Sequence, residues 1–212
     1  MDVYRTEEEQ VEAIRAWWRE NGRSAVFGVV LGLAGIFGWR GWQAHEAAQA
    51  EAASALYENM LEAARAGRSD EATTAGEKLA QEYDGSAYAT FARLTLAGLA
   101  VDAKNLDAAT GHLQQALAQK KSPALEMEIR LRLARIHVAR KEFDAALALI
   151  DAPVVVDGYA APVEELRGDI EAARGNTDAA REAYRKARAD AAGTPDDLLE
   201  LKLESLGSRA DS

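Results

Sequence analysis

The residues of this chain that could carry chemistry are few and scattered. Its only histidines are His45, His112 and His137, and no two of them lie at metal-ligand spacing. The chain has no cysteine, which excludes disulfides, thiolate metal sites and a cysteine nucleophile. Carboxylates are spread along polar helix faces, and no GxSxG, Walker or dinucleotide-binding motif occurs. The sequence therefore predicts no catalytic residue, no metal ligand and no cofactor, and we expect a protein that is not an enzyme.

The composition favours an all-α fold. The chain has 212 residues, of which 48% are hydrophobic, and only four are prolines. Alanine, leucine, glutamate and arginine are frequent, and all four are good helix formers. The formal net charge of -10 repels phosphate backbones, so nucleic acid is not an expected partner.

One uncharged segment lies between two arginines near the N-terminus. A helix over residues 22–42 would be roughly 31 Å long, which matches a bilayer hydrocarbon core of about 30 Å. Tryptophan and arginine flank this segment on both sides, where they would meet the two membrane interfaces. The predicted interface anchors are Trp17, Trp18, Arg23, Arg40 and Trp42.

We interpret this segment as an uncleaved transmembrane anchor in contact with the lipid bilayer. A secretory signal would begin with a basic region, whereas residues 1–23 carry six acidic residues against four arginines. A cleaved signal and a buried helix of a soluble protein are the alternatives. Basic residues precede the span, and none follows Arg40 until Arg65, so the positive-inside rule predicts a cytoplasmic N-terminus. Residues 43–212 would then lie in the bacterial periplasm.

Small residues mark one face of the predicted span. Gly28, Gly32, Gly35 and Trp39 follow a helical spacing, and this face could dock closely against another transmembrane helix. The alternative is that glycine is simply common in membrane helices.

Residues 1–21 are predicted to form a cytoplasmic amphipathic helix. A capping box opens at Thr6, apolar residues recur on one face, and Asn21-Gly22 is expected to end the helix. The helix could lie on the inner leaflet or contact a partner, and the sequence does not distinguish the two.

The rest of the chain repeats. Asp107, Asp144 and Asp178 each precede a pair of alanines, and Asp70 begins a weaker fourth copy; the four aspartates are separated by 37, 37 and 34 residues. This period resembles that of tetratricopeptide helix-turn-helix repeats, and we expect each aspartate to cap the second helix of its hairpin. Small residues such as Gly168 would let paired helices approach closely. The segment 196–206 reads as an amphipathic helix that closes the stack.

A repeat solenoid without catalytic groups ordinarily binds other proteins through its concave surface. Transfer of the repeat family's groove positions onto this chain gives a predicted partner-binding surface on the first helices of the hairpins. Its members are Phe91, Leu94, Asp102, Glu128, Leu131, Arg135, Val138, Glu165 and Asp169.

The chain as a whole resembles a known family. The block EEEQVEAIRAWWRENGRS, the glycine-rich span and GWRGWQAH within residues 3–43 carry most of the resemblance, and LRLARIHV, DAALALID and the LRGD of residues 166–169 add to it. These segments are similar to the YfgM family of ancillary SecYEG translocon subunits. The resemblance implies a single-pass inner-membrane protein with a periplasmic tetratricopeptide-like domain. It also implies association with the SecYEG channel and with the membrane-anchored periplasmic chaperone PpiD, in assistance of newly exported polypeptides.

Two other functions are weighed against that of a translocon scaffold or chaperone accessory. A self-assembling structural or adaptor protein of the inner membrane would use the glycine face or the repeat stack to bind its own copies. A membrane-anchored enzyme would need a pair of carboxylates in a pocket, which the sequence does not reveal.

Overall fold

The computed structural model describes residues 7–119, 122–151, 156–191 and 197–210, which form nine α-helices without a strand. These residues belong to two units, Met1–Ala52 and Ala53–Ser212. The predicted all-α fold is confirmed. The helices are α1 (Glu7–Arg65), α2 (Ser69–Glu82), α3 (Ala87–Asp102), α4 (Leu106–Ala118), α5 (Pro123–Ala139), α6 (Phe143–Ile150), α7 (Ala160–Arg174), α8 (Thr177–Asp190) and α9 (Asp197–Ala210).

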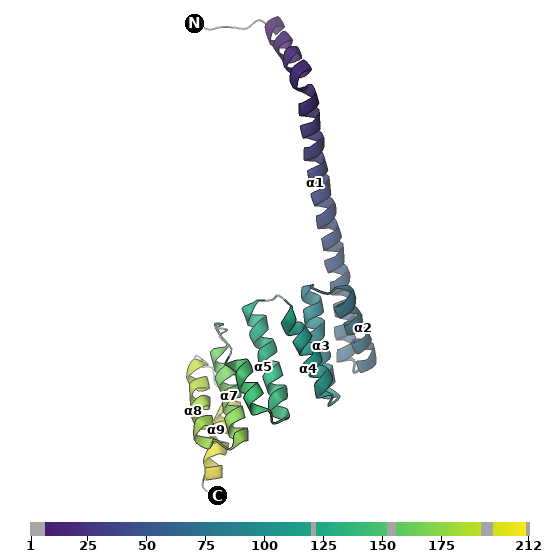
Figure 1. The fold of residues 1–212 in the computed structure, drawn as a ribbon. Helices are drawn as coiled ribbons and strands as arrows, with labels where there is room; N and C mark the ends of the chain where they lie inside the picture. Colours follow the sequence, from purple (N-terminus) through teal and green to yellow (C-terminus); the bar gives the residue numbers. More distant parts are fainter. Residues whose placement is uncertain (1–6, 120–121, 152–155, 192–196, 211–212) are drawn as a thin grey trace, which may run out of the picture. The chain divides into compact units, whose positions relative to one another are not determined.

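The first unit consists of the N-terminal part of α1, drawn in purple and blue in Figure 1. By length and composition α1 can cross a membrane, and within the described ranges it is the one helix that can. The large apolar side chains of residues 26–42 are exposed, Phe27 and Phe37 by 65% and 67%. Exposed apolar surface on this scale needs a cover that is not water, and a bilayer supplies one.

The expected helix end at Asn21-Gly22 is wrong, because α1 runs through both residues without a break. Asn21 donates its side-chain amide to the carbonyl of Trp17 at 3.3 Å, one turn earlier, and so fits the helix. The indole of Trp18 lies 3.4 Å from the place where a Cβ of Gly22 would stand. Asparagine and glycine favour a helix end but do not impose one. Here the helix continues through them into the apolar segment that follows.

The second unit is a row of antiparallel helix hairpins (Figure 1). The end of α1, from Ala53 onward, packs with α2, and the pairs α3 with α4, α5 with α6 and α7 with α8 follow. Alanines buried completely between the helices, such as Ala72 and Ala109, allow this close approach. The prediction that small residues let paired helices approach closely is therefore confirmed.

The first and last hairpins show how glycine and a large side chain complement each other. In the first, the space that a Cβ of Gly76 would need is taken by Met60 and Leu96. In the last, the ring of Tyr184 on α8 fills the space beside Gly168 on α7. Both glycines are buried, so each position accepts no larger residue without a shift of its neighbours.

Every turn between the two helices of a hairpin has the same backbone form. Gly67, Lys104, Lys141 and Gly175 all adopt a left-handed conformation, with φ between 59° and 86°. This conformation ends a helix by reversing the chain, and it is costly for a residue other than glycine. The turns recur at the same period as the four aspartates.

The expectation that the aspartates cap the second helices is wrong by a short shift in register. The cap of α4 is Asn105, whose side-chain oxygen accepts a hydrogen bond from the backbone N–H of Ala108 at 3.1 Å. Asp107 lies inside the first turn, where its charge still opposes the positive end of the helix dipole. It also pairs with Arg140 at the end of α5, in the next hairpin. Asp144 pairs in the same way with Arg174 of α7.

Helix α9 closes the described part of the stack, as expected. Leu199 and Leu206 are buried and share a core cluster with Ala180, Tyr184 and Ala187 of α8.

Candidate partner-binding groove

A groove of about 460 Å³ lies on the second unit between α3 and α5, with α4 contributing to its lining. Its inner surface is apolar, because Leu94, Leu113 and Ile136 are core residues with one edge at the groove. Gly98 and Ala139 are small and exposed, and they keep the groove open between the two helices. The full lining is Leu94, Ala97, Gly98, Val101, Asp102, Leu106, Leu113, Glu128, Arg132, Arg135, Ile136 and Ala139.

Capping residues mark the starts of α3 and α5, the two helices between which the groove lies. The hydroxyl of Ser86 accepts a hydrogen bond from the N–H of Ala89 at 3.0 Å and caps α3. The hydroxyl of Ser122 accepts one from Leu125 at 3.3 Å and caps α5, and Pro123 occupies the first turn of that helix. Such caps satisfy backbone donors that have no partner inside the helix.

Charged side chains form the rim of the groove. Glu128 and Arg132 pair along α5 at 2.7 Å. Arg135 and Asp102 are exposed, and no ion pair within the described part of the chain engages either of them. The groove therefore offers one guanidinium and one carboxylate beside apolar walls, which suits a polypeptide segment of mixed character.

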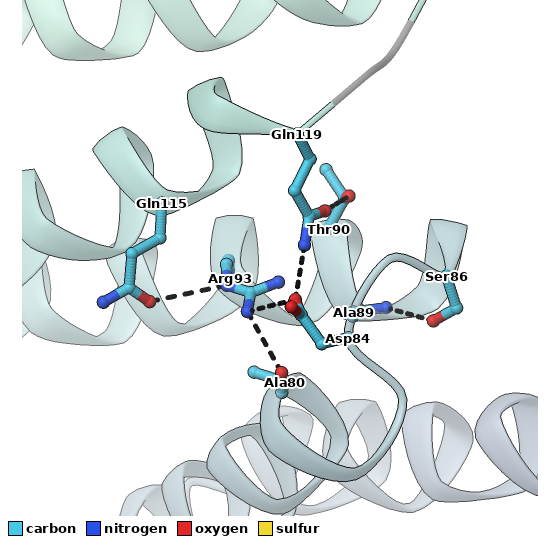
Figure 2. Close-up of polar contacts among 8 residues, drawn as sticks. All are labelled: Ala80, Asp84, Ser86, Ala89, Thr90, Arg93, Gln115 and Gln119. Atoms are coloured by element: carbon cyan, nitrogen blue, oxygen red, sulfur yellow. Dashed lines mark hydrogen bonds and ion pairs between the residues drawn. The ribbon is translucent and has the colours of Figure 1, made fainter.

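A polar network fixes α3 against α2 and α4, as Figure 2 shows. Arg93 is 7% exposed, and its Nη2 donates to the carbonyl of Ala80 at 3.0 Å and to Asp84 Oδ1 at 2.9 Å. Gln119, just beyond α4, donates to the same oxygen of Asp84 at 2.7 Å and accepts from the hydroxyl of Thr90. The network therefore joins three consecutive helices, two of which line the groove.

The pKa values of two groups, Asp84 and His112, are lowered in and beside this network. A hydrogen bond from Arg93, together with its positive charge, lowers the pKa of Asp84. Burial lowers the pKa of His112 on α4, and although the charge of Glu77 opposes this change, Arg93 reinforces it. Asp84 is thus held ionised beside Arg93, while neutral His112 is favoured.

The structure brings four of the predicted surface residues into the groove: Leu94, Asp102, Glu128 and Arg135. Phe91 lies on α3 one turn before Leu94 and is 37% exposed, but it does not line the groove. Its ring instead faces Tyr57, with the ring centroids 6.2 Å apart.

Two predicted residues of α5 face the core and not the groove. Leu131 is 1% exposed and belongs to the core cluster that α5 shares with α6 and α7, and Val138 packs against that cluster. The expectation that Leu131 points outward is therefore wrong. The groove face of α5 carries residues 128, 132, 135 and 139, and positions 131 and 138 lie about a quarter turn around the helix from its centre.

Glu165 and Asp169 of α7 are occupied by the closing helix. Lys202 of α9 donates to Glu165 Oε1 at 2.6 Å and to Asp169 Oδ2 at 2.9 Å, and the hydroxyl of Tyr184 donates to Asp169 Oδ1 at 2.7 Å. The ammonium of Lys202 also lies 5.7 Å from the centre of the Tyr184 ring. These two carboxylates therefore attach α9 to the stack.

Sequence reasoning missed several lining residues, among them Gly98, Val101, Arg132 and Ala139. Gly98, Arg132 and Ala139 each lie four residues from a predicted member of the same helix, which was a usable signal. Val101 has no predicted member at that spacing. The sequence pattern also did not predict the Arg93 network, because its partners lie 9 to 35 residues apart on different elements.

In the first unit, the predicted docking glycines are open. A Cβ built at Gly28, Gly32 or Gly35 meets no described atom within 4 Å, and Trp39 on the same face is 59% exposed. The predicted interface anchors Trp17, Trp18 and Trp42 are exposed by 53%, 56% and 54%, and Arg23 and Arg40 flank the span. In the described ranges, no three side chains of His, Asp or Glu gather into a set that could hold a metal ion.

Comparison with known proteins decides the family. A family model described as a tetratricopeptide repeat-like domain matches residues 15–208. A protein of Escherichia coli (strain K12) named "Ancillary SecYEG translocon subunit" is 36% identical over 207 residues, which cover 97% of this chain and 99% of that protein. The chain belongs to the ancillary SecYEG translocon subunit family.

Two more relatives with that name support the assignment. The ancillary SecYEG translocon subunit of Haemophilus influenzae is 31% identical over 201 residues, 94% of this chain and 97% of its own. That of Neisseria gonorrhoeae is 30% identical over 211 residues, 97% of this chain and 100% of its own. The resemblance found in the sequence is thus confirmed. A translocon subunit family with a tetratricopeptide-like fold is a family of accessory proteins and not of enzymes.

Proposed function

We propose that this chain is a membrane-anchored, non-enzymatic scaffold at the SecYEG translocon whose repeat domain binds a second protein. The carrying observation is the α3–α5 groove, with apolar walls and a rim guanidinium, on a protein whose relatives are named translocon subunits. An anchor near the channel would raise the local concentration of the repeat domain, so that individually weak contacts suffice.

The proposed topology follows the distribution of arginine around the span. Residues 1–21 are cytoplasmic, residues 22–42 cross the bacterial inner membrane, and residues 43–212 lie in the periplasm. The open face of Gly28, Gly32, Gly35 and Trp39 docks against a transmembrane helix of the translocon, since small residues let helix backbones approach.

The proposed occupant of the groove is a segment of the periplasmic chaperone PpiD or of a newly exported polypeptide. The apolar walls of the groove would take a large apolar side chain of that segment. Arg135 would pair with a carboxylate on it, because no carboxylate of the described chain occupies this guanidinium.

Copurification in mild detergent tests this proposal. We expect the wild-type chain to carry both SecYEG and PpiD, and Arg135→Glu to lose PpiD and exported chains while it keeps SecYEG through the span. Arg188→Glu is the matched control, since Arg188 is exposed on α8 and outside the groove. Recovery of only further copies of this chain would favour self-assembly instead.

Topology is tested by cysteine labelling, because the natural chain contains no cysteine. In intact spheroplasts, a membrane-impermeant maleimide should label His45→Cys at once and Glu9→Cys only after the membrane is opened. The reverse pattern would place the repeat domain in the cytoplasm and refute the periplasmic partners.

A further inference from the structure

A hollow on α1 beside Gly22 combines aromatic, basic and apolar side chains, and the groove-binding function leaves it unused. Because Gly22 has no side chain, the indole of Trp18 lies over it and forms one wall. Arg19 and Arg23, four residues apart, lie on one helix face. The lining residues are Trp18, Arg19, Gly22, Arg23, Val26, Phe27 and Val30.

The two guanidiniums have donors to offer. Within the described part of the chain, no ion pair engages Arg19 or Arg23, although Glu20 lies only three residues before Arg23. Arg15 adds a third cation one turn before Arg19, and it lines a neighbouring hollow to which Glu12 also contributes. Arginine presents a planar fork of donors that matches the oxygens of a phosphate.

The hollow changes character along the helix. Beyond Arg23, its lining continues with Val26, Phe27 and Val30, which are exposed by 51%, 65% and 56%. The order along the helix is therefore indole and guanidinium first, then aliphatic and phenyl side chains. A phospholipid has the same order, with a phosphate group followed by hydrocarbon chains.

We propose that this hollow is a binding site for an anionic phospholipid. The lipid phosphate accepts hydrogen bonds from Arg19 and Arg23, one acyl chain lies against Val26, Phe27 and Val30, and the indole of Trp18 borders the headgroup. Indole rings favour this depth of a bilayer, and each arginine near an anionic surface contributes to binding. A free phosphate ion would use the arginines but not the apolar half of the hollow.

Fluorescence quenching in lipid vesicles tests the site. The full chain carrying Trp17→Phe, Trp39→Phe and Trp42→Phe leaves Trp18 as the one fluorescent indole. At equal mole fraction, brominated phosphatidylglycerol should quench Trp18 more strongly than brominated phosphatidylcholine, with an enrichment of about fivefold. The preference should vanish in Arg19→Gln/Arg23→Gln and persist in Arg40→Gln, the matched control beyond the far end of the apolar segment. Equal quenching by the two lipids, or a preference that survives the double substitution, would overturn the proposal.

Two further arms make the result specific. Inorganic phosphate added at constant ionic strength should leave the preference intact, and its loss would assign the arginines to free phosphate. For a chain that keeps all its tryptophans, anionic phospholipid retained through detergent purification should fall in Arg19→Gln/Arg23→Gln and not in Arg40→Gln. Unchanged retention in the double variant would contradict the site without reliance on the tryptophan substitutions.

Discussion

At the scale of single residues, two kinds of backbone position determine how the hairpins close. Gly168 is a contact position, where an added Cβ would stand 2.3 Å from two ring carbons of Tyr184. Lys104 is a conformational position, where a side chain is present although the backbone is left-handed, with φ of 59°. At Gly168 an added side-chain atom would clash. At Lys104 a glycine, which has no side chain, would adopt the left-handed backbone at lower cost.

The contact position is tested by Gly168→Ala. The added methyl must displace a buried ring or the backbone, so we expect a loss of about 1–3 kcal/mol in the free energy of unfolding. Gly98→Ala is the control, since its Cβ would meet nothing within 4 Å and alanine favours helix. Thermal and urea unfolding of both variants in detergent should separate them, and equal stability would contradict the close packing of α7 on α8.

The conformational position is tested by Lys104→Gly. Glycine removes the left-handed strain but loosens the unfolded chain, so the expected net gain is about 0.5–1 kcal/mol. Gly175→Ala places a side chain at the equivalent turn and should lose a similar amount. If Lys104→Gly lowered the unfolding midpoint, the assigned turn conformation would be wrong.

At the scale of elements, polar clusters that span several helices hold the stack in register. Arg93 joins α2, α3 and the end of α4, and Lys202 joins α9 to α7. Both cations are largely buried and hydrogen-bonded to more than one partner. The loss of either should therefore cost more stability than the loss of an exposed ion pair.

Arg93→Ala should lower the free energy of unfolding by about 2–3 kcal/mol, because it leaves the Ala80 carbonyl without its partner and opens space between helices. Arg132→Ala, which removes an exposed pair within α5, should change stability by about 0.5 kcal/mol or less.

Because the pKa of Asp84 lies below its ordinary 3.8, its contribution to stability is present above pH 3.8 and lost as the pH falls through the lowered value. Asp84→Asn should therefore flatten the acid side of the stability profile, and an unchanged profile would count against the network.

The attachment of α9 predicts an alkaline effect. Burial acts to lower the pKa of Lys202, but hydrogen bonds from its ammonium to Asp169 and Glu165 and their charges outweigh burial, so the pKa is raised above 10.5. Its stabilising contribution is therefore complete below pH 10.5 and lost as the pH rises through the raised value. Lys202→Met should speed amide exchange in α9 and abolish this alkaline loss, whereas Lys186→Met should leave exchange in α9 unchanged. Wild-type exchange rates in Lys202→Met would show that α9 is held by its leucines alone.

The sequence predicted where the helices lie better than which side of each helix faces the groove. The recurring aspartates located the hairpin turns, and the small residues located the close contacts, because both signals are local and periodic. The rotation of α5 was missed, since whether Leu131 or Arg132 faces the groove depends on how α6 and α7 pack behind it. The Arg93 network left no local pattern, and the caps were misplaced because Asn105 and Asp107 are both good residues for a helix start.

At the scale of the whole molecule, the chain combines a helix that is long and apolar enough to cross a membrane with a repeat domain that carries an apolar groove. Both parts present surfaces suited to other molecules. The chain belongs to the ancillary SecYEG translocon subunit family. We propose that a second protein binds in the α3–α5 groove.

Site-specific photocrosslinking in inner-membrane vesicles tests that claim most directly. A photoreactive residue at Gly98 lies in the groove, and one at Gly111 on α4 lies outside its lining; a Cβ at either position would meet no described atom within 4 Å. We expect adducts to PpiD or to exported chains from Gly98 and few or none from Gly111. Equal adducts from both positions, or adducts from Gly98 to further copies of this chain alone, would contradict it.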